Sequence, residues 1–481
     1  MKERLLDTRT RIVATLGPAS STVEGITGLV EAGADVLRLN LSHGTPEAHV
    51  ETIRRIREVE RDLARPLAIM ADLPGPKLRL HAEECTAEVD SGGEVEIRIH
   101  PDSDRGLVVD RPEAISRLQP GHRVLIDDGL IRLLVVEVEE THARCSVLAG
   151  GCLRPRVGVN LPDTEMPIPA VDEEDLALAE LMADQEVDYV AVSFCRDGDD
   201  LRNLRRHLAE RGTGAVHLVA KVERPVAVEC IDDIVKAADA ILVARGDLGV
   251  EMDVARVPLV QKQIVQASRR LGRPVIVATQ MLQSMIEAKV PTRAEASDVA
   301  NAILDGADAV MLSGETAVGH HPQLVVETMH RIIDATEQFQ EPLAMTGIEL
   351  AGLAHQPSWM PALASGAWKI VEDLQPRFMA IWTSTGEAAR MLSRSVLPAP
   401  LIAFTEDVRV ARRMQMMRGV CGVVVDRPES RDDFPGVVEH FLRDACEGRT
   451  GDLCLVLSGP GFDQEDAIDS ISILKVNGGI S

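Results

Sequence analysis

Three charged residues, Lys221, Glu223 and Asp247, stand in a pattern that suits metal-assisted chemistry on an anion. Lys221 and Glu223 are two positions apart in the apolar run 216–223, so their side chains face the same side of a predicted strand. Asp247 belongs to the next such run. Two carboxylates from neighbouring strands suit Mg²⁺, which completes its shell with water and substrate oxygens. A structural ion pair is the alternative for these residues taken alone.

Two arginines add positive charge at the ends of other predicted strands. Arg38, Arg79 and Lys221 could together clamp a phosphate, because a guanidinium donates two parallel hydrogen bonds to one anion. For a lone arginine, a surface charge is the alternative.

Short oxygen-bearing residues near these arginines have the look of a monovalent-cation site. They are Asn40, Ser42 and Asp72, and turn capping is the alternative for Asn40 and Ser42. His43 has no evident carboxylate partner nearby, so a binding or structural role is favoured over that of a base.

The elements that must position these residues form a strand–turn–helix repeat. Eight βα units predict a closed parallel (β/α)8 TIM barrel, whose active site gathers at the carboxyl ends of the strands. An open doubly wound sheet is the alternative, but no GxGxxG follows the first strand. The predicted strands span 11–17, 36–42, 67–73, 189–194, 216–223, 240–249, 274–280 and 309–314.

The repeat is interrupted once and ends well before the chain does. From about 75 to 166 the sequence shows short alternating runs separated by turn residues, which predicts an inserted small β-barrel lid domain. We predict a barrel domain of residues 1–74 and 167–340, a lid of residues 75–166 and a C-terminal α/β domain of residues 341–481.

Composition narrows the classes of function. A net charge of −25 argues against a nucleic-acid or anionic-membrane partner. No apolar run is long enough to span a membrane, and the N-terminus lacks a signal peptide, so we expect a cytoplasmic protein. The eight cysteines form no CxxC pair, which argues against a zinc ribbon or a redox motif.

The chain resembles pyruvate kinase from about residue 10 to 460. The resemblance implies a catalytic A domain, a B domain that closes as a lid, a regulatory C domain and a homotetramer. It also implies that Mg²⁺ or Mn²⁺ assists transfer of a phosphoryl group from phosphoenolpyruvate to ADP, giving pyruvate and ATP. The matching segments include RTRIVATLGPAS, LRLNLSHG, ADLPGPKLR, IDDGLI, GVNLP, AKVE, VARGDLGVE, VATQMLQSM and PTRAEASDVANAILDGADAVMLSGETA.

The resemblance also implies roles for individual residues. Glu223 and Asp247 would bind the divalent metal, and Lys221 would stabilise the phosphoryl group in flight. Thr279 would lie by the enolate and take part in its protonation through water. Ser193 and the backbone at Ala244 and Gly246 would contact the substrate. The nucleotide and phosphate side would be lined by Thr15, Pro18, Arg38, Asn40, His43 and Arg79, with Asp128 approaching from the lid.

Three departures from the family pattern carry expectations. Lys77 stands where many members have Glu, so its ammonium would replace K⁺, although the ligand set of Asn40, Ser42, Asp72 and the Leu73 carbonyl is intact. Val157 stands where a lysine commonly reaches the nucleotide, which leaves Arg154 and Arg156 as nearby cations.

The third departure lies in the loop that binds sugar phosphates in activated members. Here it reads Thr383, Ser384, Thr385, Gly386, Glu387, with Ala388 next. Glu387 would repel a phosphate, so we expect weak or no activation by fructose 1,6-bisphosphate.

Two other functions share parts of this pattern. A metal-dependent phosphoenolpyruvate or pyruvate aldolase or lyase would share the carboxylate pair but would not need the lid or the two arginines. A non-catalytic sensor derived from the kinase could have lost Lys221 or a metal ligand, yet all are present.

Overall fold

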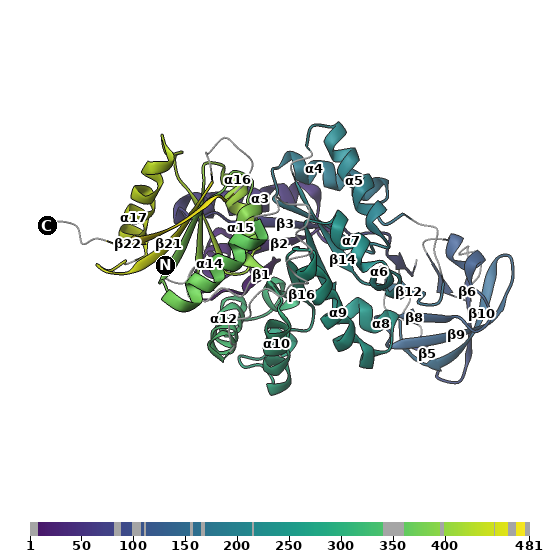
Figure 1. Cartoon of the computed structure of the whole chain (residues 1–481). Coiled ribbons are helices and arrows are strands. Elements are labelled where there is room, and N and C mark those ends of the chain that lie inside the picture. The colour runs from purple at the N-terminus through teal and green to yellow at the C-terminus, as the bar shows by residue number, and fades with distance from the viewer. Residues whose placement is uncertain are drawn as a thin grey trace.

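The fold has three parts in a row, with the barrel between the inserted β domain and the C-terminal domain (Figure 1). The structure is a computed structural model. It describes residues 8–80, 88–98, 107–109, 112–153, 157–164, 169–213, 216–339, 360–394, 399–446, 448–459 and 468–476.

Eight parallel strands close into a barrel, which confirms the predicted fold class. The strands are apolar and almost wholly buried because helices cover their outer face and packed side chains fill the interior. They are β1 (Arg11–Leu16), β2 (Val36–Asn40), β3 (Ala68–Asp72), β13 (Tyr189–Val192), β14 (His217–Val222), β15 (Ala240–Ala244), β16 (Val275–Ala278) and β17 (Ala309–Leu312).

Several helices around the barrel start at side-chain caps that the sequence supplies. Thr45 caps α3, and Thr292 forms a reciprocal capping box with Glu295 at the start of α10. The helices are α2 (Val23–Ala32), α3 (Pro46–Leu63), α4 (Glu173–Asp184), α5 (Gly198–Glu210), α6 (Pro225–Glu229), α7 (Ile231–Ala237), α8 (Arg245–Glu251), α9 (Val257–Arg270), α10 (Arg293–Asp305), α11 (Gly314–Ala317) and α12 (Pro322–Phe339).

One predicted strand was too long. The run 240–249 divides after Ala244, where β15 ends and α8 begins at Arg245. A fully buried parallel strand cannot hold Arg245 and Asp247, so the chain turns into a helix that presents both side chains at the barrel rim.

The inserted domain is built from short strands around its own apolar core. Its main sheet has the order β4-β12-β8-β9-β10-β6-β7, and β11 pairs with β5 beside it. The strands are β4 (Leu78–Arg79), β5 (Glu88–Val89), β6 (Glu94–Arg98), β7 (Leu107–Val108), β8 (Arg123–Ile126), β9 (Ile131–Val138), β10 (His142–Ala149), β11 (Gly151–Cys152) and β12 (Gly158–Asn160).

The C-terminal domain is a five-stranded sheet of order β20-β19-β18-β21-β22 with helices on it. It is parallel except for β22, which pairs antiparallel with β21. Its elements are α14 (Met360–Leu374), β18 (Phe378–Trp382), α15 (Glu387–Ser393), β19 (Leu401–Thr405), α16 (Val408–Met414), β20 (Val420–Val424), α17 (Phe434–Ala445), β21 (Leu453–Ser458) and β22 (Ser470–Lys475). No described helix is both long and apolar enough to cross a membrane.

The amino ends of alternate barrel strands carry buried aspartates. Each accepts a hydrogen bond from the first residues of a neighbouring strand, as in Asp35 from Ile12 N at 2.9 Å and Asp308 from Val275 N at 2.9 Å. Each also pairs with an arginine. The four pairs are Asp35 with Arg11, Asp188 with Arg57, Asp239 with Arg205 and Asp308 with Arg394. Arg394 belongs to the C-terminal domain, so the last pair joins the two domains.

Candidate active site

A buried ammonium lies at the centre of the site. Lys221 Nζ is 2.9 Å from Glu223 Oε1 and 3.1 Å from Asp72 Oδ1, and it donates a 2.7 Å hydrogen bond to Ser193 Oγ. Lys221 is the next-to-last residue of β14, and the residues that precede it in the strand pack in the barrel wall. The structure thus brings together side chains from three strand ends, as predicted.

Arg38 holds the other side of Asp72. Its Nε and Nη2 both donate to Asp72 Oδ2, at 2.8 and 2.6 Å, and its Nη1 donates to Thr15 Oγ1 at 3.0 Å. Thr15 in turn donates to Leu312 O at 2.7 Å, which links the ends of β1 and β17. Asp72 therefore fixes both cations side by side at the carboxyl end of the barrel.

Burial makes the charges in this cluster interdependent. Burial alone would lower the pKa of Lys221, but the carboxylates of Asp72 and Glu223 outweigh it and hold that pKa above its ordinary value. Burial would likewise raise the pKa of Asp72, yet Lys221 and Arg38 keep it below the usual range. Lys221 stays cationic at any physiological pH as a result.

Glu223 and Asp247 converge as a two-carboxylate pair. Burial raises the pKa of Glu223 despite its contact with Lys221, and the charge of Asp247 adds to the rise. A divalent cation between the two carboxylates would relieve their electrostatic repulsion, so the residues fit Mg²⁺ or Mn²⁺. Among the described residues, no group of three or more His, Cys, Asp or Glu side chains forms a metal site.

Thr279 stands beside this pair in an unusual backbone conformation. Its φ is 71°, a left-handed value that is rare for a β-branched residue. Its Oγ1 accepts from Gly246 N at 2.7 Å and donates to Ala278 O at 2.6 Å. Arg245 braces the same turn by donating to Thr279 O at 2.7 Å, while Asp298 of α10 lies 2.7 Å from its guanidinium.

Residues of the inserted domain also lie at the carboxyl end of the barrel, near Asp247 and Thr279. Asp127 and Asp128 form a tight turn with φ of 55° and 52°, and Lys77 Nζ lies 4.0 Å from Asp128 Oδ1. Lys77 and Asp128 line a cleft of about 960 Å³ together with Gly246, Asp247 and Thr279. Behind the lid, Asn160 donates to the buried carboxylate of Glu251 at 2.8 Å.

Other predicted site residues have local partners. Asn40 Oδ1 accepts from Ser42 N at 3.2 Å, the Leu73 carbonyl accepts from Ser193 Oγ at 2.8 Å, and the His43 carbonyl lies 2.8 Å from His49 Nε2. Pro18 is exposed in the turn after β1, and Arg79 lies in β4 against Gly158 of β12. Ala244 is the last residue of β15, directly before α8.

The C-terminal loop lies at the other end of the barrel. Thr383 Oγ1 accepts from Gly386 N at 2.8 Å, and Glu387 is paired with Arg390, which also donates to Gly272 O. Arg154 and Arg156, named as possible substitutes for a lysine at 157, fall outside the described residues.

Sequence patterns do not single out four residues that make contacts at the site: Arg245, Glu251, Phe194 and Arg224. Each is adjacent to, or one helical turn from, a predicted site residue. Arg245 falls within the predicted strand 240–249. A charged residue directly after a buried strand was the available signal, but its partners lie on distant segments.

Comparison with known proteins agrees with this geometry. Residues 7–326 match the family model for the pyruvate kinase barrel domain, and residues 361–474 match the model for the pyruvate kinase alpha/beta domain. A pyruvate kinase of Methylorubrum extorquens is 41% identical over 97% of both chains. Those of Corynebacterium glutamicum and Mycobacterium tuberculosis are 40% and 39% identical over 94% of this chain. The chain belongs to the pyruvate kinase family.

Proposed function

We propose that Lys221 stabilises the phosphoryl group as it passes from phosphoenolpyruvate to ADP, the reaction that yields pyruvate and ATP. The observation that carries this role is the Lys221–Asp72–Arg38 cluster, because it sets two fixed cations at the mouth of the barrel. Such a transfer needs positioned positive charge more than covalent chemistry.

Glu223 and Asp247 would hold the divalent metal, whose charge offsets that of the phosphoryl and enolate oxygens. Phosphoenolpyruvate would lie against the cleft wall formed by Gly246 and Thr279, with Ser193 and Ala244 close by. The Thr279 hydroxyl is held beside the place where the enolate would form. Its part would be to order the water that delivers a proton to the enolate carbon.

The nucleotide would enter beneath the lid. Asp128 and Lys77 face the same cleft from that side, and Thr15, Arg38 and Arg79 would provide the phosphate contacts nearer the barrel. Pro18, Asn40 and His43 would line the outer part of the nucleotide site. Restoring lysine at Val157 should lower the apparent KM for ADP.

The chain should work without K⁺. The Asp72 carboxylate is already compensated by Arg38 and Lys221, and the side chain of Lys77 brings a further positive charge to the cleft. Assays in sodium or Tris salts test this, and a drop of more than about tenfold on omitting K⁺ would contradict it.

Fructose 1,6-bisphosphate should not activate the protein through the loop of residues 383–387. Arg390, three residues after Glu387 in α15, is already paired with Glu387. A strong leftward shift of the phosphoenolpyruvate saturation curve with this effector would refute the expectation.

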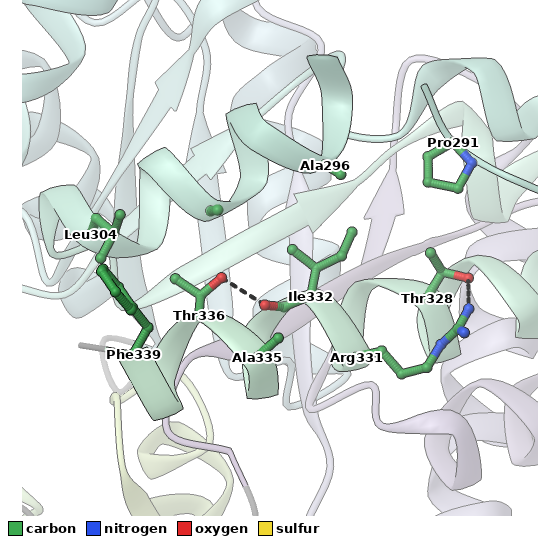
Figure 2. Close-up of a pocket in the computed structure, with 10 residues that line it drawn as sticks. Pro291, Ala296, Leu304, Thr328, Arg331, Ile332, Ala335, Thr336 and Phe339 are labelled. Atoms are coloured by element: carbon green, nitrogen blue, oxygen red, sulfur yellow. Dashed lines mark hydrogen bonds between the residues drawn. The ribbon is translucent and has the colours of Figure 1, made fainter. Parts of the chain in front are cut away.

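A homotetramer in the cytoplasm is the expected working form. An apolar groove of about 540 Å³ runs between α10 and α12, and Phe339 at its edge is 82% exposed. Figure 2 shows Leu304 of α10 directly above the ring of Phe339 of α12. Light scattering on the protein as it elutes from a sizing column measures the molar mass of the assembly. The molar mass of a monomer would contradict the expected homotetramer.

Coupled measurement of ADP-dependent pyruvate formation tests the central proposal. Activity that requires both phosphoenolpyruvate and ADP supports the kinase. Pyruvate formation without ADP would favour a lyase, and binding without turnover would favour a sensor.

A further inference from the structure

Phe194 occupies a strained position next to the metal-binding carboxylate. Its φ is 56°, in the left-handed region that non-glycine residues rarely adopt. Its backbone N–H donates a 2.8 Å hydrogen bond to Glu223 Oε2. Because Lys221 engages the other oxygen at 2.9 Å, these two contacts fix the plane of the Glu223 carboxylate.

Such a backbone conformation persists only where the surroundings enforce it. On one side, Gly75 packs so closely that a Cβ there would lie 2.7 Å from Ser193 Cβ and 2.9 Å from Phe194 Cδ2. The Arg224 guanidinium stacks over the Phe194 ring, 4.9 Å from its centroid. Both Gly75 and Arg224 therefore restrict the position of the ring.

Besides this contact, the charge of Arg224 acts on the buried carboxylate of Glu251 and offsets part of the rise that burial causes in its pKa. Within the part of the chain that the structure describes, the side chain of Arg224 has no hydrogen-bond or ion-pair partner, and its Nε is buried. Pro225 restricts the backbone of Arg224 to an extended conformation, observed at φ −130° and ψ 151°. An arginine that only solubilised the surface would not be stacked and partly buried in this way.

We infer that Arg224 is a positioning residue: by clamping the Phe194 ring it holds the Phe194 N–H against Glu223 and so orients this carboxylate for the divalent metal. The inference rests on the proposed role of Glu223 and Asp247. Groups that orient metal ligands commonly change metal affinity by about 10- to 100-fold when they are removed.

The test compares Arg224→Leu, which keeps apolar bulk over the ring, with Arg224→Lys, which keeps the positive charge. Binding of Mn²⁺ to the full-length protein is followed by electron paramagnetic resonance, without turnover. Arg224→Leu should weaken Mn²⁺ binding about tenfold, and Arg224→Lys should restore most of it. The Mg²⁺ concentration for half-maximal activity should rise in parallel, while Tm should change little.

Two further variants separate this inference from the metal site itself. Asp247→Asn should weaken Mn²⁺ binding directly, and Arg211→Gln at the exposed end of α5 controls for loss of one positive charge. Unchanged Mn²⁺ binding in Arg224→Leu, with weakened binding in Asp247→Asn, would overturn the positioning role alone. Unchanged binding in Asp247→Asn would overturn the metal assignment and this inference with it.

Discussion

The two ends of the barrel both bury ion pairs, but they use them differently. At the amino end, Asp308 accepts from Val275 N and pairs with Arg394, so its oxygens are satisfied within the packed domain interface. At the carboxyl end, Glu223 is equally buried and Lys221 is largely buried, but the neighbouring Asp247 lines an open cleft. Buried charge alone therefore does not mark a functional site. Charge that borders a cavity, with capacity left for a ligand, does.

The largest expected difference between the two ends is in catalysis. Lys221→Met should lower kcat by about three orders of magnitude, since it removes fixed positive charge where the phosphoryl group would develop negative charge. Steady-state kinetics measures this. Lys369→Met, on an exposed face of α14, is the control and should leave kcat unchanged. Near-normal kcat in Lys221→Met would show that the ion pairs at the carboxyl end do not have the catalytic role that distinguishes them from those at the amino end.

Substitutions at the amino end of the barrel should lower the stability of the protein rather than kcat. Arg394→Met leaves Asp308 buried without its cation, which should lower the free energy of unfolding by about 3–5 kcal/mol. Denaturant unfolding measures this, and kcat per folded molecule should change little. The double variant Arg394→Met with Asp308→Asn should recover part of the loss. A loss of kcat with unchanged stability would contradict the comparison.

A third prediction concerns Lys77, which lies on the lid side of the cleft at the carboxyl end of the barrel. Lys77→Glu should reduce the rate in K⁺-free buffer by about tenfold or more, and added K⁺ should restore it. Lys77→Gln should show a smaller loss that K⁺ repairs less. Equal rates with and without K⁺ in Lys77→Glu would exclude this lysine as the substitute for the cation.

The last prediction concerns the pH dependence of stability and His217 at the start of β14. Burial lowers its pKa to about 4, and its ring packs edge-on against Tyr189 with centroids 5.7 Å apart. A neutral buried histidine contributes stability above pH 6.5 that is lost as the pH falls toward its folded pKa. The free energy of unfolding should thus fall by about 2 kcal/mol between pH 6.5 and 5. His217→Gln should flatten that slope, and an unchanged slope would contradict the assignment.

The barrel, the insertion and the identity of the central residues can be predicted from the sequence alone. Strand periodicity and the eightfold repeat predict where Lys221, Glu223 and Asp72 lie, because parallel strands bring their carboxyl ends to one rim. Local chemistry also predicts the Thr292–Glu295 cap, which depends on residues three positions apart.

Which of these groups are in contact depends on the three-dimensional packing. The end of β15 at Ala244 depends on what the barrel wall can bury, and the pairing of Arg38 with Asp72 joins residues 34 positions apart. The contact of Arg224 with Phe194 depends on a left-handed backbone that no local pattern predicts. Sequence spacing fixes which elements form and which way they face. Contacts between distant segments follow only when packing sets side-chain positions to within a few ångströms.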